Sequence, residues 1–541
     1  MKKSKKLFSF LKKNLCFFLL CLVLNIISGY SKSAGAIYLQ KITDTLEAKS
    51  TDYILVFVLI GGGLTFVSYV LRWLGAVVPN YLTQKFAYET RVELFTHLSK
   101  ISFIKYEGYS QGELQSIIQN DTEKAGQIFY TVLSRMLNNI FLFIFSVWVM
   151  ANTNVPATIV TVLIVLVATA VNQLILKRLK IHEKGAQRNI AEMTYSLGST
   201  FSSMETVKTF WAKDYVMKNF IEKQDRYCEN RIRSTRVGAV RTIWSTLIEN
   251  FCLYGSIGYL GFLGLSGKIT IGEVMMFIYL IKQIIMPIEV VLRWLSTLTS
   301  SYASFERILE KLDEETENIS INTDIPANIK VIKVDDISFS YGSGYPIIKD
   351  LDILLESCNI TGFSSASGTG KTTLLKILSG LYESPTVKYE IDGKSVDSLK
   401  GIVAYASLEN SLFPMTIYEN IAIANENLTK NDIKLALEKL GFKEWLSSLP
   451  EGVDTPLNQN VSGGQRQAVS NARVILSGKP FIILDEPYSA LDTAKERALN
   501  RILEKEKHNR IILITSHRED VFMRADRKLQ LSLERRKELH K

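Results

Sequence analysis

Cysteine and histidine are scarce in this chain of 541 residues, which contains five of each. The cysteines are odd in number, lie far apart and form no CxxC pair, which excludes a disulfide framework and a zinc ribbon. The histidines show no metal-ligand spacing, so they predict no metal site. The residues concerned are Cys16, Cys21, Cys228, Cys252 and Cys358, with His97, His182, His508, His517 and His540.

Charged residues make up only 22% of the chain, hydrophobic residues make up 47%, and the mean hydropathy is +0.10. Disordered chains have low hydrophobicity, so disorder is excluded as the main state. A chain lying wholly in the membrane would carry fewer charges. A protein that is part membrane and part soluble fits both values, and the length exceeds the ~250–300 residues that one core usually reaches.

Six apolar stretches before residue 300 are long enough to supply the ~20 residues needed to cross the hydrocarbon core of a bilayer. They predict spans at about 15–37, 53–78, 132–151, 155–176, 244–265 and 271–297. We therefore expect a transmembrane domain over 1–300, a polar linker over 301–330 and a soluble domain over 331–541. The first stretch also resembles a cleaved secretory signal, with lysines before it and Ala34-Gly35-Ala36 near its end. Its length and the spans that follow favour an uncleaved span.

The distribution of charge predicts the topology. Six lysines in residues 1–14 favour a cytosolic N-terminus, and six spans then return the chain to the cytosol. The connections on the inner side, 79–131 and 177–243, are long, which predicts helices that continue beyond the bilayer. Much of the net charge of +10 lies beside the spans, facing anionic lipid headgroups, so it does not indicate nucleic-acid binding.

Lys282 is unusual because it lies about 11 residues into the last predicted span, roughly 16 Å deep. Charges at that depth are costly and either pair internally or line a functional cavity. Pairing with Glu289, two turns further along the same face, is one hypothesis. A cation that meets an anionic part of a substrate is the other.

In the soluble half, short β-branched runs alternate with helical stretches. Residues 358–363, 480–485 and 510–516 read as buried strands of a parallel sheet with helical crossovers. The first strand leads into a loop typical of phosphate binding, in which backbone N–H groups and a helix N-terminus surround phosphate oxygens. Lys371 would reach the β- and γ-phosphates, and the Thr372 hydroxyl would coordinate Mg²⁺. The loop comprises Ser365, Ala366, Ser367, Gly368, Thr369, Gly370, Lys371, Thr372 and Thr373.

Two acidic residues, Asp485 and Glu486, follow the second strand. An aspartate in this position would hold Mg²⁺, and the adjacent glutamate would orient or deprotonate the attacking water. The alternative is that the two acids only cap the next helix. His517 follows the third strand, at the edge of the sheet where such folds bind ligands, and is a candidate to contact the γ-phosphate.

A second anion site is predicted at Ser462, Gly463, Gly464 and Gln465, where a serine followed by two glycines would cap a helix. One nucleotide does not need two separated phosphate sites from the same chain. Two chains facing head to tail would use both, because each would cover the ATP held by the other.

Together these motifs resemble the ATP-binding cassette (ABC) transporters, specifically exporters with six spans fused ahead of one cassette. The resemblance implies that Tyr341 stacks on adenine, that residues 462–465 are the signature, that residues 489–492, ending at Asp492, are the D-loop, and that His517 is a switch histidine. The implied fold is an all-α membrane domain of six helices with long cytosolic extensions, followed by an α/β P-loop NTPase domain. Short coupling helices near Asn120-Asp121 and 203–212 would touch the cassettes.

Three positions depart from the family pattern. Ser365 replaces the first glycine of the phosphate loop, and a serine there would be strained by roughly 1–2 kcal/mol if φ were positive. Leu408 occupies the position of a glutamine that contacts Mg²⁺ and the attacking water, and leucine can do neither. Val461 replaces a leucine, which is a conservative apolar exchange.

The sequence thus predicts an exporter half that binds ATP and Mg²⁺, hydrolyses ATP and works with a second half-transporter as a homodimer or heterodimer. The expected location is the plasma membrane of a bacterium, with the cassette in the cytosol and membrane lipid around the spans. The expected substrate is a drug, lipid or peptide. The alternative is a subunit that binds ATP but hardly hydrolyses it, in a heterodimer whose other chain supplies the chemistry; Ser365 and Leu408 favour it, whereas Glu486 and His517 oppose it.

Overall fold

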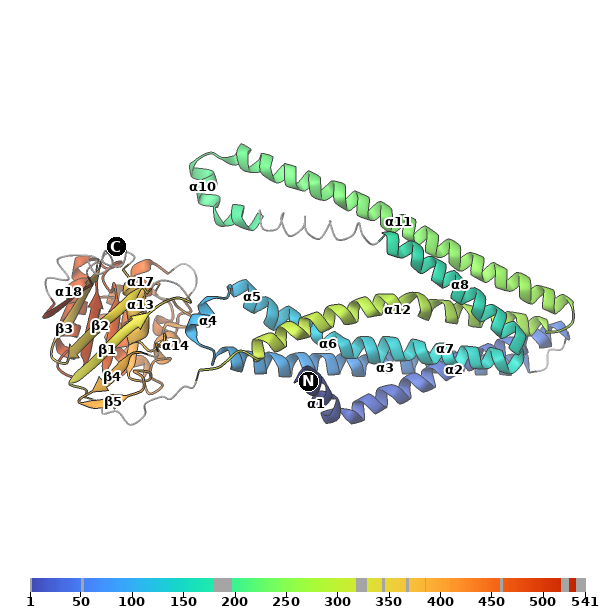
Figure 1. Ribbon diagram of the computed structural model, residues 1–541, viewed down its shortest axis with the longest axis horizontal. Coiled ribbons are helices and arrows are strands. Elements are labelled where there is room, and N and C mark those ends of the chain that lie inside the picture. Colours follow the sequence, from blue (N-terminus) through green and yellow to red (C-terminus); the bar gives the residue numbers. More distant parts are fainter. Residues whose placement is uncertain are drawn as a thin grey trace. The chain divides into compact units, whose positions relative to one another are not determined.

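The chain falls into two compact units (Figure 1). The helical unit comprises Met1–Thr96 and Gln111–Asp313, and the sheet unit comprises His97–Ser110 and Glu314–Lys541. The computed structural model describes residues 2–49, 53–179, 197–317, 328–342, 346–365, 369–384, 386–409, 411–457, 461–516 and 525–531.

Long helices dominate the first part of the chain. Apart from α4, which is described below, the helical elements described there are, in order, α1 (Lys2–Lys13), α2 (Leu15–Glu47), α3 (Ile54–Leu98), α5 (Gln111–Ser116), the π-helical turn η1 (Ile117–Asp121), α6 (Thr122–Tyr130), the π-helical turn η2 (Thr131–Met136), α7 (Leu137–Thr153), α8 (Val155–Leu179), α10 (Met204–Thr209), α11 (Lys213–Leu265) and α12 (Ile271–Leu312). Several far exceed the ~20 residues of a membrane crossing. For example, α3 has 45 residues and α11 has 53.

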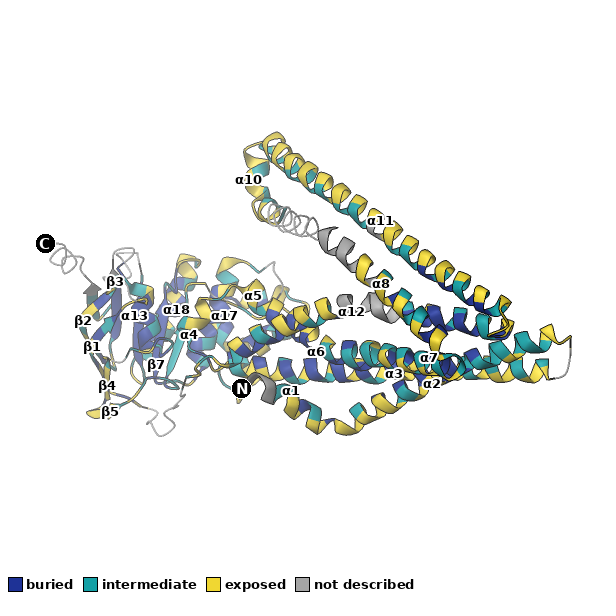
Figure 2. Cartoon of the chain, turned by 45° about the vertical axis from the view of Figure 1, so that its right-hand side comes forward, coloured by how far each residue is buried: buried dark blue, intermediate teal, exposed yellow. Residues whose placement is uncertain are grey.

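Three of the described helical stretches are long and apolar enough to cross a membrane: Leu15–Glu47, Ile54–Leu98 and Gln111–Thr153. In α3 only 6% of the most apolar window is buried, and its exposed side chains include Leu59 and Phe66. Exposed residues lie along much of this and the other long helices (Figure 2). An apolar surface of this kind suits lipid. The mainly helical membrane domain is thus confirmed, while the number of spans stays a prediction.

Within the helical unit, α2 packs against α7 and α12. Two buried polar side chains of α2 find partners within this unit. The Ser33 and Ser146 hydroxyls lie 3.1 Å apart, and the Asn25 amide donates to the Leu133 carbonyl at 2.8 Å. The side chain of Lys282 is exposed, whereas that of Glu289 lies outside those described, so both hypotheses for Lys282 stay open.

The prediction of a coupling helix near Asn120-Asp121 is wrong. Asp121 ends η1 and is only 2% exposed, because α12 covers it. Its carboxylate accepts hydrogen bonds from Arg307 at 2.8 Å and from Ser304 at 3.0 Å. The short helix that belongs to the sheet unit is instead α4 (Phe103–Glu107). A short helix, α10, does occur within the range 203–212, and its contact with a cassette stays a prediction.

Both strands and helices contribute to the sheet unit. Its strands are β1 (Val331–Phe339), β2 (Ile348–Glu356), β3 (Ile360–Ser365), β4 (Lys388–Ile391), β5 (Lys394–Val396), β6 (Val403–Ala406), β7 (Phe481–Asp485), β8 (Ile511–Thr515) and β9 (Arg527–Leu531). Besides α4, its helices are α13 (Lys371–Leu378), α14 (Ile417–Ala422), α15 (Lys430–Lys439), α16 (Lys443–Ser448), the 3-10 turn η4 (Gly452–Asp454), α17 (Gly463–Leu476) and α18 (Thr493–Glu506).

The strands form two sheets. An antiparallel sheet has the order β2-β1-β4-β5, and a parallel sheet has the order β6-β7-β8-β3-β9. The three strands predicted to be parallel correspond to β3, β7 and β8, so that prediction is confirmed, as is the α/β fold. β7 and β8 are buried at every residue, which is why they read as continuous apolar runs. The exact boundaries of the predicted domains stay a prediction.

Removing the Asp121 carboxylate should destabilise the helical unit. We expect Asp121→Ala to cost about 1–3 kcal/mol, because it deletes buried hydrogen bonds to α12. Thermal unfolding of the detergent-purified protein measures the effect. Glu123→Ala removes the same charge from an exposed site on α6 and serves as the control. Equal melting temperatures for the two variants would contradict the prediction.

Candidate active site

The loop that the sequence predicts to bind phosphate lies between β3 and α13, in the predicted order of strand, loop and helix. The helix begins at Lys371, and Gly370 caps it with a φ of +99°. A Cβ at Gly370 would lie 2.7 Å from Ile347, so both the backbone and the space require glycine here. Ala366, Ser367 and Gly368, with the side chain of Ser365, lie outside the described residues, so the strain predicted at Ser365 stays a prediction.

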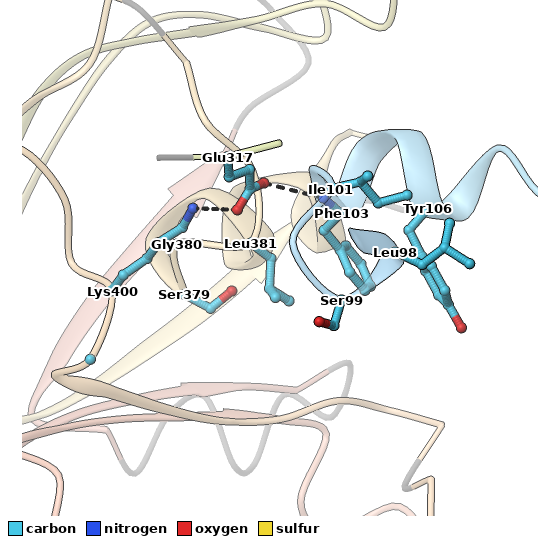
Figure 3. A pocket seen from close by; sticks show the side chains of 11 residues that line it. Leu98, Ser99, Ile101, Phe103, Tyr106, Glu317, Ser379, Gly380, Leu381 and Lys400 are labelled. Carbon is cyan, nitrogen blue, oxygen red and sulfur yellow. Dashed lines mark hydrogen bonds and ion pairs between the residues drawn. The ribbon is translucent and has the colours of Figure 1, made fainter. Parts of the chain in front are cut away.

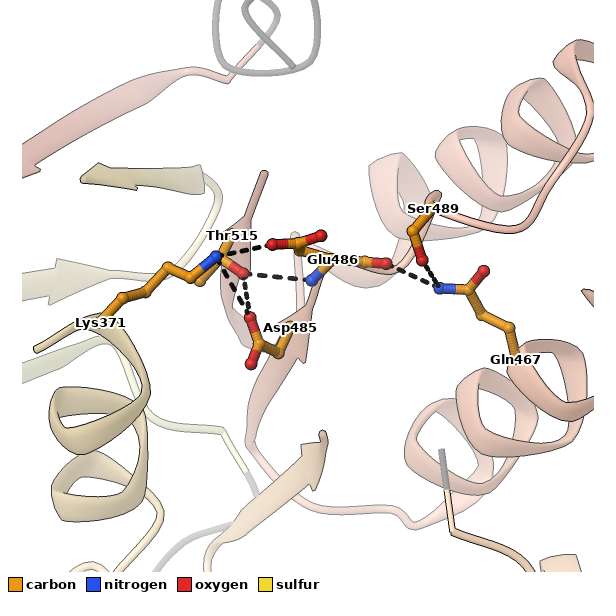
Figure 4. Close-up of polar contacts among 6 residues, drawn as sticks. All are labelled: Lys371, Gln467, Asp485, Glu486, Ser489 and Thr515. Carbon is orange, nitrogen blue, oxygen red and sulfur yellow. Dashed lines mark hydrogen bonds and ion pairs between the residues drawn. The ribbon is translucent and has the colours of Figure 1, made fainter. Parts of the chain in front are cut away.

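Lys371, Asp485 and Glu486 meet at the carboxyl ends of β3 and β7 (Figure 4). The Lys371 ammonium donates to Glu486 Oε1 at 2.8 Å and lies 3.8 Å from Asp485 Oδ1. Asp485 is only 4% exposed. Charges in such surroundings are paired because water cannot solvate them well. The structure therefore brings together three residues that the sequence predicted for one site.

Thr515, which the sequence analysis missed, supports both acids. Its hydroxyl donates to Asp485 Oδ1 at 2.5 Å and accepts from the Glu486 backbone N–H at 3.1 Å. It lies directly opposite Asp485 in the pairing of β7 with β8. Its place at the end of a buried strand, two residues before His517, was the available signal. His517 itself lies outside the described residues.

Glu486 has a left-handed backbone, with a φ of +52°. A non-glycine residue in this region costs about 1–3 kcal/mol and persists where its surroundings fix it. Here the backbone N–H of Glu486 is bound by Thr515 and its carbonyl accepts from Gln467. Strain of this kind concentrates at functional sites.

Gln467, on α17, is the second residue that the sequence analysis missed. Its amide nitrogen donates to the Glu486 carbonyl at 2.7 Å and to the Ser489 hydroxyl at 3.3 Å, and its oxygen accepts from the Ala490 N–H at 2.9 Å. The side chain is 99% buried. It therefore fixes Glu486 and the loop that follows it to the helix of the signature.

The signature residues adopt the predicted cap. Ser462 caps α17 and forms a reciprocal capping box with Gln465, while Ser462 and Gly463 are exposed. The exposed start of this helix therefore has the geometry that the sequence predicted for an anion site. A Cβ at Gly464 would lie 2.7 Å from the Ala490 carbonyl oxygen, so the signature packs directly on the loop that ends at Asp492.

Asp492 and Tyr341 are also fixed by neighbours. Asp492 caps α18, and hydrogen bonds from the side chain and backbone of Lys495 lower the pKa of its carboxyl group. The Tyr341 hydroxyl lies 3.2 Å from the Thr373 hydroxyl and 3.1 Å from that of Tyr382. Thr373 is thus used by the tyrosine, while its neighbour Thr372 is exposed.

The donor set suits a magnesium ion shared with a nucleotide. Mg²⁺ is usually bound by one or two carboxylates together with substrate phosphates, and Asp485 with Thr372 offers one carboxylate and one hydroxyl. Among the described residues, no three His, Cys, Asp or Glu side chains cluster to hold a metal by themselves. Leu408 is 50% exposed and adds no oxygen ligand.

Comparisons with known proteins agree along the chain. Residues 18–288 match the family model of the ABC transporter transmembrane region, and residues 348–489 match that of the ABC transporter. The ABC transporter ATP-binding protein YfiC of Bacillus subtilis is 26% identical, with 96% of this chain and 88% of the relative covered. The ATP-dependent lipid A-core flippase of Chromobacterium violaceum is 25% identical, with 85% and 81% covered.

A solved structure has the same fold. A bacterial Atm1-family ABC exporter with ATP bound superposes with a TM-score of 0.77 at 20% identity, covering 96% of this chain and 94% of that one.

The two signature glycines should respond differently to substitution. Gly464→Ala forces a Cβ against the Ala490 carbonyl, and we expect it to destabilise the sheet unit by about 1–3 kcal/mol. Gly463→Ala is the matched control, because its Cβ would lie at an ordinary 3.6 Å from Ala490 and alanine favours helix. Thermal unfolding compares them. A Gly464→Ala protein as stable as the Gly463→Ala protein would refute the close contact.

Proposed function

This chain belongs to the ABC transporter family, and we propose that it is one half of a dimeric exporter that moves a drug, lipid or peptide across a bacterial plasma membrane. Its ATP-binding domain and exporter relatives make it an ATP hydrolase coupled to transport. The observation that carries the proposal is the convergence of Lys371, Asp485 and Glu486 at the ends of two parallel strands.

Lys371 and Glu486 would exchange partners during the cycle. The Lys371 ammonium nitrogen lies 2.8 Å from Glu486 Oε1. The oxygens of an incoming triphosphate would compete with this carboxylate for the ammonium. Once Lys371 turns to the phosphates, Glu486 is released to orient the attacking water and accept its proton. Asp485 and Thr372 would hold Mg²⁺, which neutralises charge on the phosphates when it is bound.

The signature residues are the reason to infer a second chain. Ser462 and Gly463 expose the start of a 14-residue helix, and a helix of this length has the dipole and free N–H groups to bind phosphate. Gln467 ties this helix to Glu486 of the same chain. We infer that closure of two chains places this helix against the triphosphate on Lys371 of the partner. ATP then favours the closed pair because it binds that state better.

One observation favours the second candidate, a subunit that binds ATP but hardly hydrolyses it. Leu408 stands where the family has a glutamine, and its apolar side chain can neither orient water nor bind Mg²⁺. Glu486, by contrast, is present and is held in place through its N–H and carbonyl groups. We therefore place hydrolysis in this chain.

Replacing the glutamate tests the function. We expect Glu486→Gln in the full chain to lower Mg-ATPase activity at least 100-fold while ATP still binds, since the amide cannot accept the proton of water. Glu504→Gln, an exposed change on α18, is the control and should keep full activity. Unchanged turnover in Glu486→Gln would contradict the proposed role of Glu486 as the acceptor of the water proton. Wild-type protein that turns ATP over only when a second chain is added would favour the other candidate.

Replacing Leu408 with the glutamine that the family has at this position should increase the rate of ATP hydrolysis. We expect Leu408→Gln to raise the ATPase rate about tenfold, which is the rate equivalent of one hydrogen bond to the transition state. Leu435→Gln makes the same change at an exposed position of α15 and should have no effect. An unaltered rate in Leu408→Gln would show that this position does not limit hydrolysis.

A further inference from the structure

A chain of hydrogen bonds connects the helix α4 to the tyrosine expected to bind the base. Glu107, at the end of α4, accepts hydrogen bonds from the Lys376 ammonium and from the Tyr382 hydroxyl. The Tyr382 hydroxyl is also 3.1 Å from the hydroxyl of Tyr341, which lies 3.2 Å from that of Thr373. All five residues belong to the sheet unit.

The donor and the acceptor of each of these hydrogen bonds can be assigned from the chemistry of the groups. A carboxylate only accepts, so the single hydroxyl proton of Tyr382 goes to Glu107. Tyr382 must then accept from Tyr341, and Tyr341 must accept from Thr373. Burial and the hydrogen bonds to Glu107 and Tyr341 raise the pKa of Tyr382, so its proton stays in place. Burial acts to raise the pKa of Glu107, but its bonds from Lys376 and Tyr382 prevail and lower it, so it stays a carboxylate.

Contacts between aromatic rings also hold Tyr341 and Tyr382 in place. Tyr382 stacks on Phe339 with ring centroids 5.2 Å apart, and Tyr341 meets both rings edge-on, at 5.1 Å from Phe339 and 5.9 Å from Tyr382. Tyr382 is only 1% exposed, whereas Tyr341 is 45% exposed. One tyrosine is therefore a fixed internal support, and the other offers an accessible surface to a ligand.

The start of α4 is anchored as well, so Glu107 is a fixed acceptor. Glu317 accepts from the Phe103 backbone N–H at 3.3 Å and from the Lys400 ammonium at 2.7 Å, beside a cavity of about 450 Å³ (Figure 3). The chain next to it forms a β-bridge between Ile101 and Thr316. With Glu107 held at the other end, α4 is bound to the sheet unit at both termini.

We propose that Tyr382 is a positioning residue for the nucleotide base, which orients Tyr341 through a hydrogen-bond chain that ends on Glu107 of α4. The inference rests on the proposed function, in which Tyr341 stacks on adenine. Loss of the Glu107 contact frees the Tyr382 hydroxyl, and Tyr341 then loses its fixed orientation. Base affinity and the docking of α4 are therefore coupled, and by thermodynamic linkage each strengthens the other.

The first experiment separates the base from the phosphates. Binding of ATP and of inorganic tripolyphosphate is measured by calorimetry on the full chain in detergent, with Glu486→Gln present so that no turnover occurs. We expect Tyr382→Phe to raise the Kd for ATP about three- to tenfold, the effect of one hydrogen bond, and to leave that for tripolyphosphate unchanged. Tyr389→Phe, which alters a buried tyrosine on β4, is the control and should change neither.

The second experiment tests the connection to α4. Glu107→Ala removes both acceptor oxygens and should weaken ATP binding as Tyr382→Phe does, and the double variant should be no weaker than the stronger single one, because both changes break the same series of hydrogen bonds. Glu383→Ala is the matched control, since Glu383 pairs with Lys400. Fully additive effects of the two changes would overturn the coupling.

Two outcomes separate this inference from the proposed function. If Tyr341→Ala weakens ATP but not tripolyphosphate while Tyr382→Phe weakens neither, positioning by Tyr382 is wrong and the adenine contact stands. If Tyr341→Ala leaves ATP binding unchanged, the adenine contact fails and the positioning role fails with it. Equal weakening of ATP and tripolyphosphate by Tyr382→Phe would show a merely structural role and would also overturn the inference.

Discussion

The hydrogen bond between Thr515 and Asp485 is the constraint on which the catalytic end of the sheet depends. β7 and β8 are otherwise apolar and buried throughout, so alternation of polar and apolar residues cannot set their register. A shift of the register by one residue would leave the buried carboxylate without its hydrogen-bond donor. That loss costs more free energy than exchanging one apolar neighbour for another. The pairing of Asp485 with Thr515 thus aligns the strand ends, and Lys371 and Glu486 converge there as a consequence.

Much of the sheet unit could be predicted because its signals are local. Buried parallel strands are short apolar runs, and β3, β7 and β8 appear where such runs occur in the sequence. Asp485 and Glu486 were found because they stand at the end of such a run, and Lys371 because it belongs to a phosphate-loop motif that follows one. Gln467 and Thr515 were missed because their roles depend on neighbours distant in the sequence: Gln467 reaches the Glu486 carbonyl 19 residues away, and Thr515 reaches Asp485 30 residues away.

The first part of the chain shows what the family resemblance and local signals could not predict. A coupling helix was expected near Asn120-Asp121, yet Asp121 is covered by Ser304 and Arg307, more than 180 residues further along. The helix α4 was missed because five residues are too few to show a helical period. Its position is set by Glu107 and Phe103, whose partners lie in the later part of the chain. Long apolar helices, by contrast, can be recognised in the sequence from their length and composition alone.

The β-bridge between Ile101 and Thr316 has a mechanical consequence. Ile101 follows the end of α3 by three residues, and Thr316 follows the end of α12 by four. The Glu317 N–H also donates to the Lys100 carbonyl at 2.8 Å, so the two connecting strands of chain are joined by backbone bonds as well as by side chains. The segment that follows α3 therefore cannot separate from the segment that follows α12 without breaking these backbone hydrogen bonds.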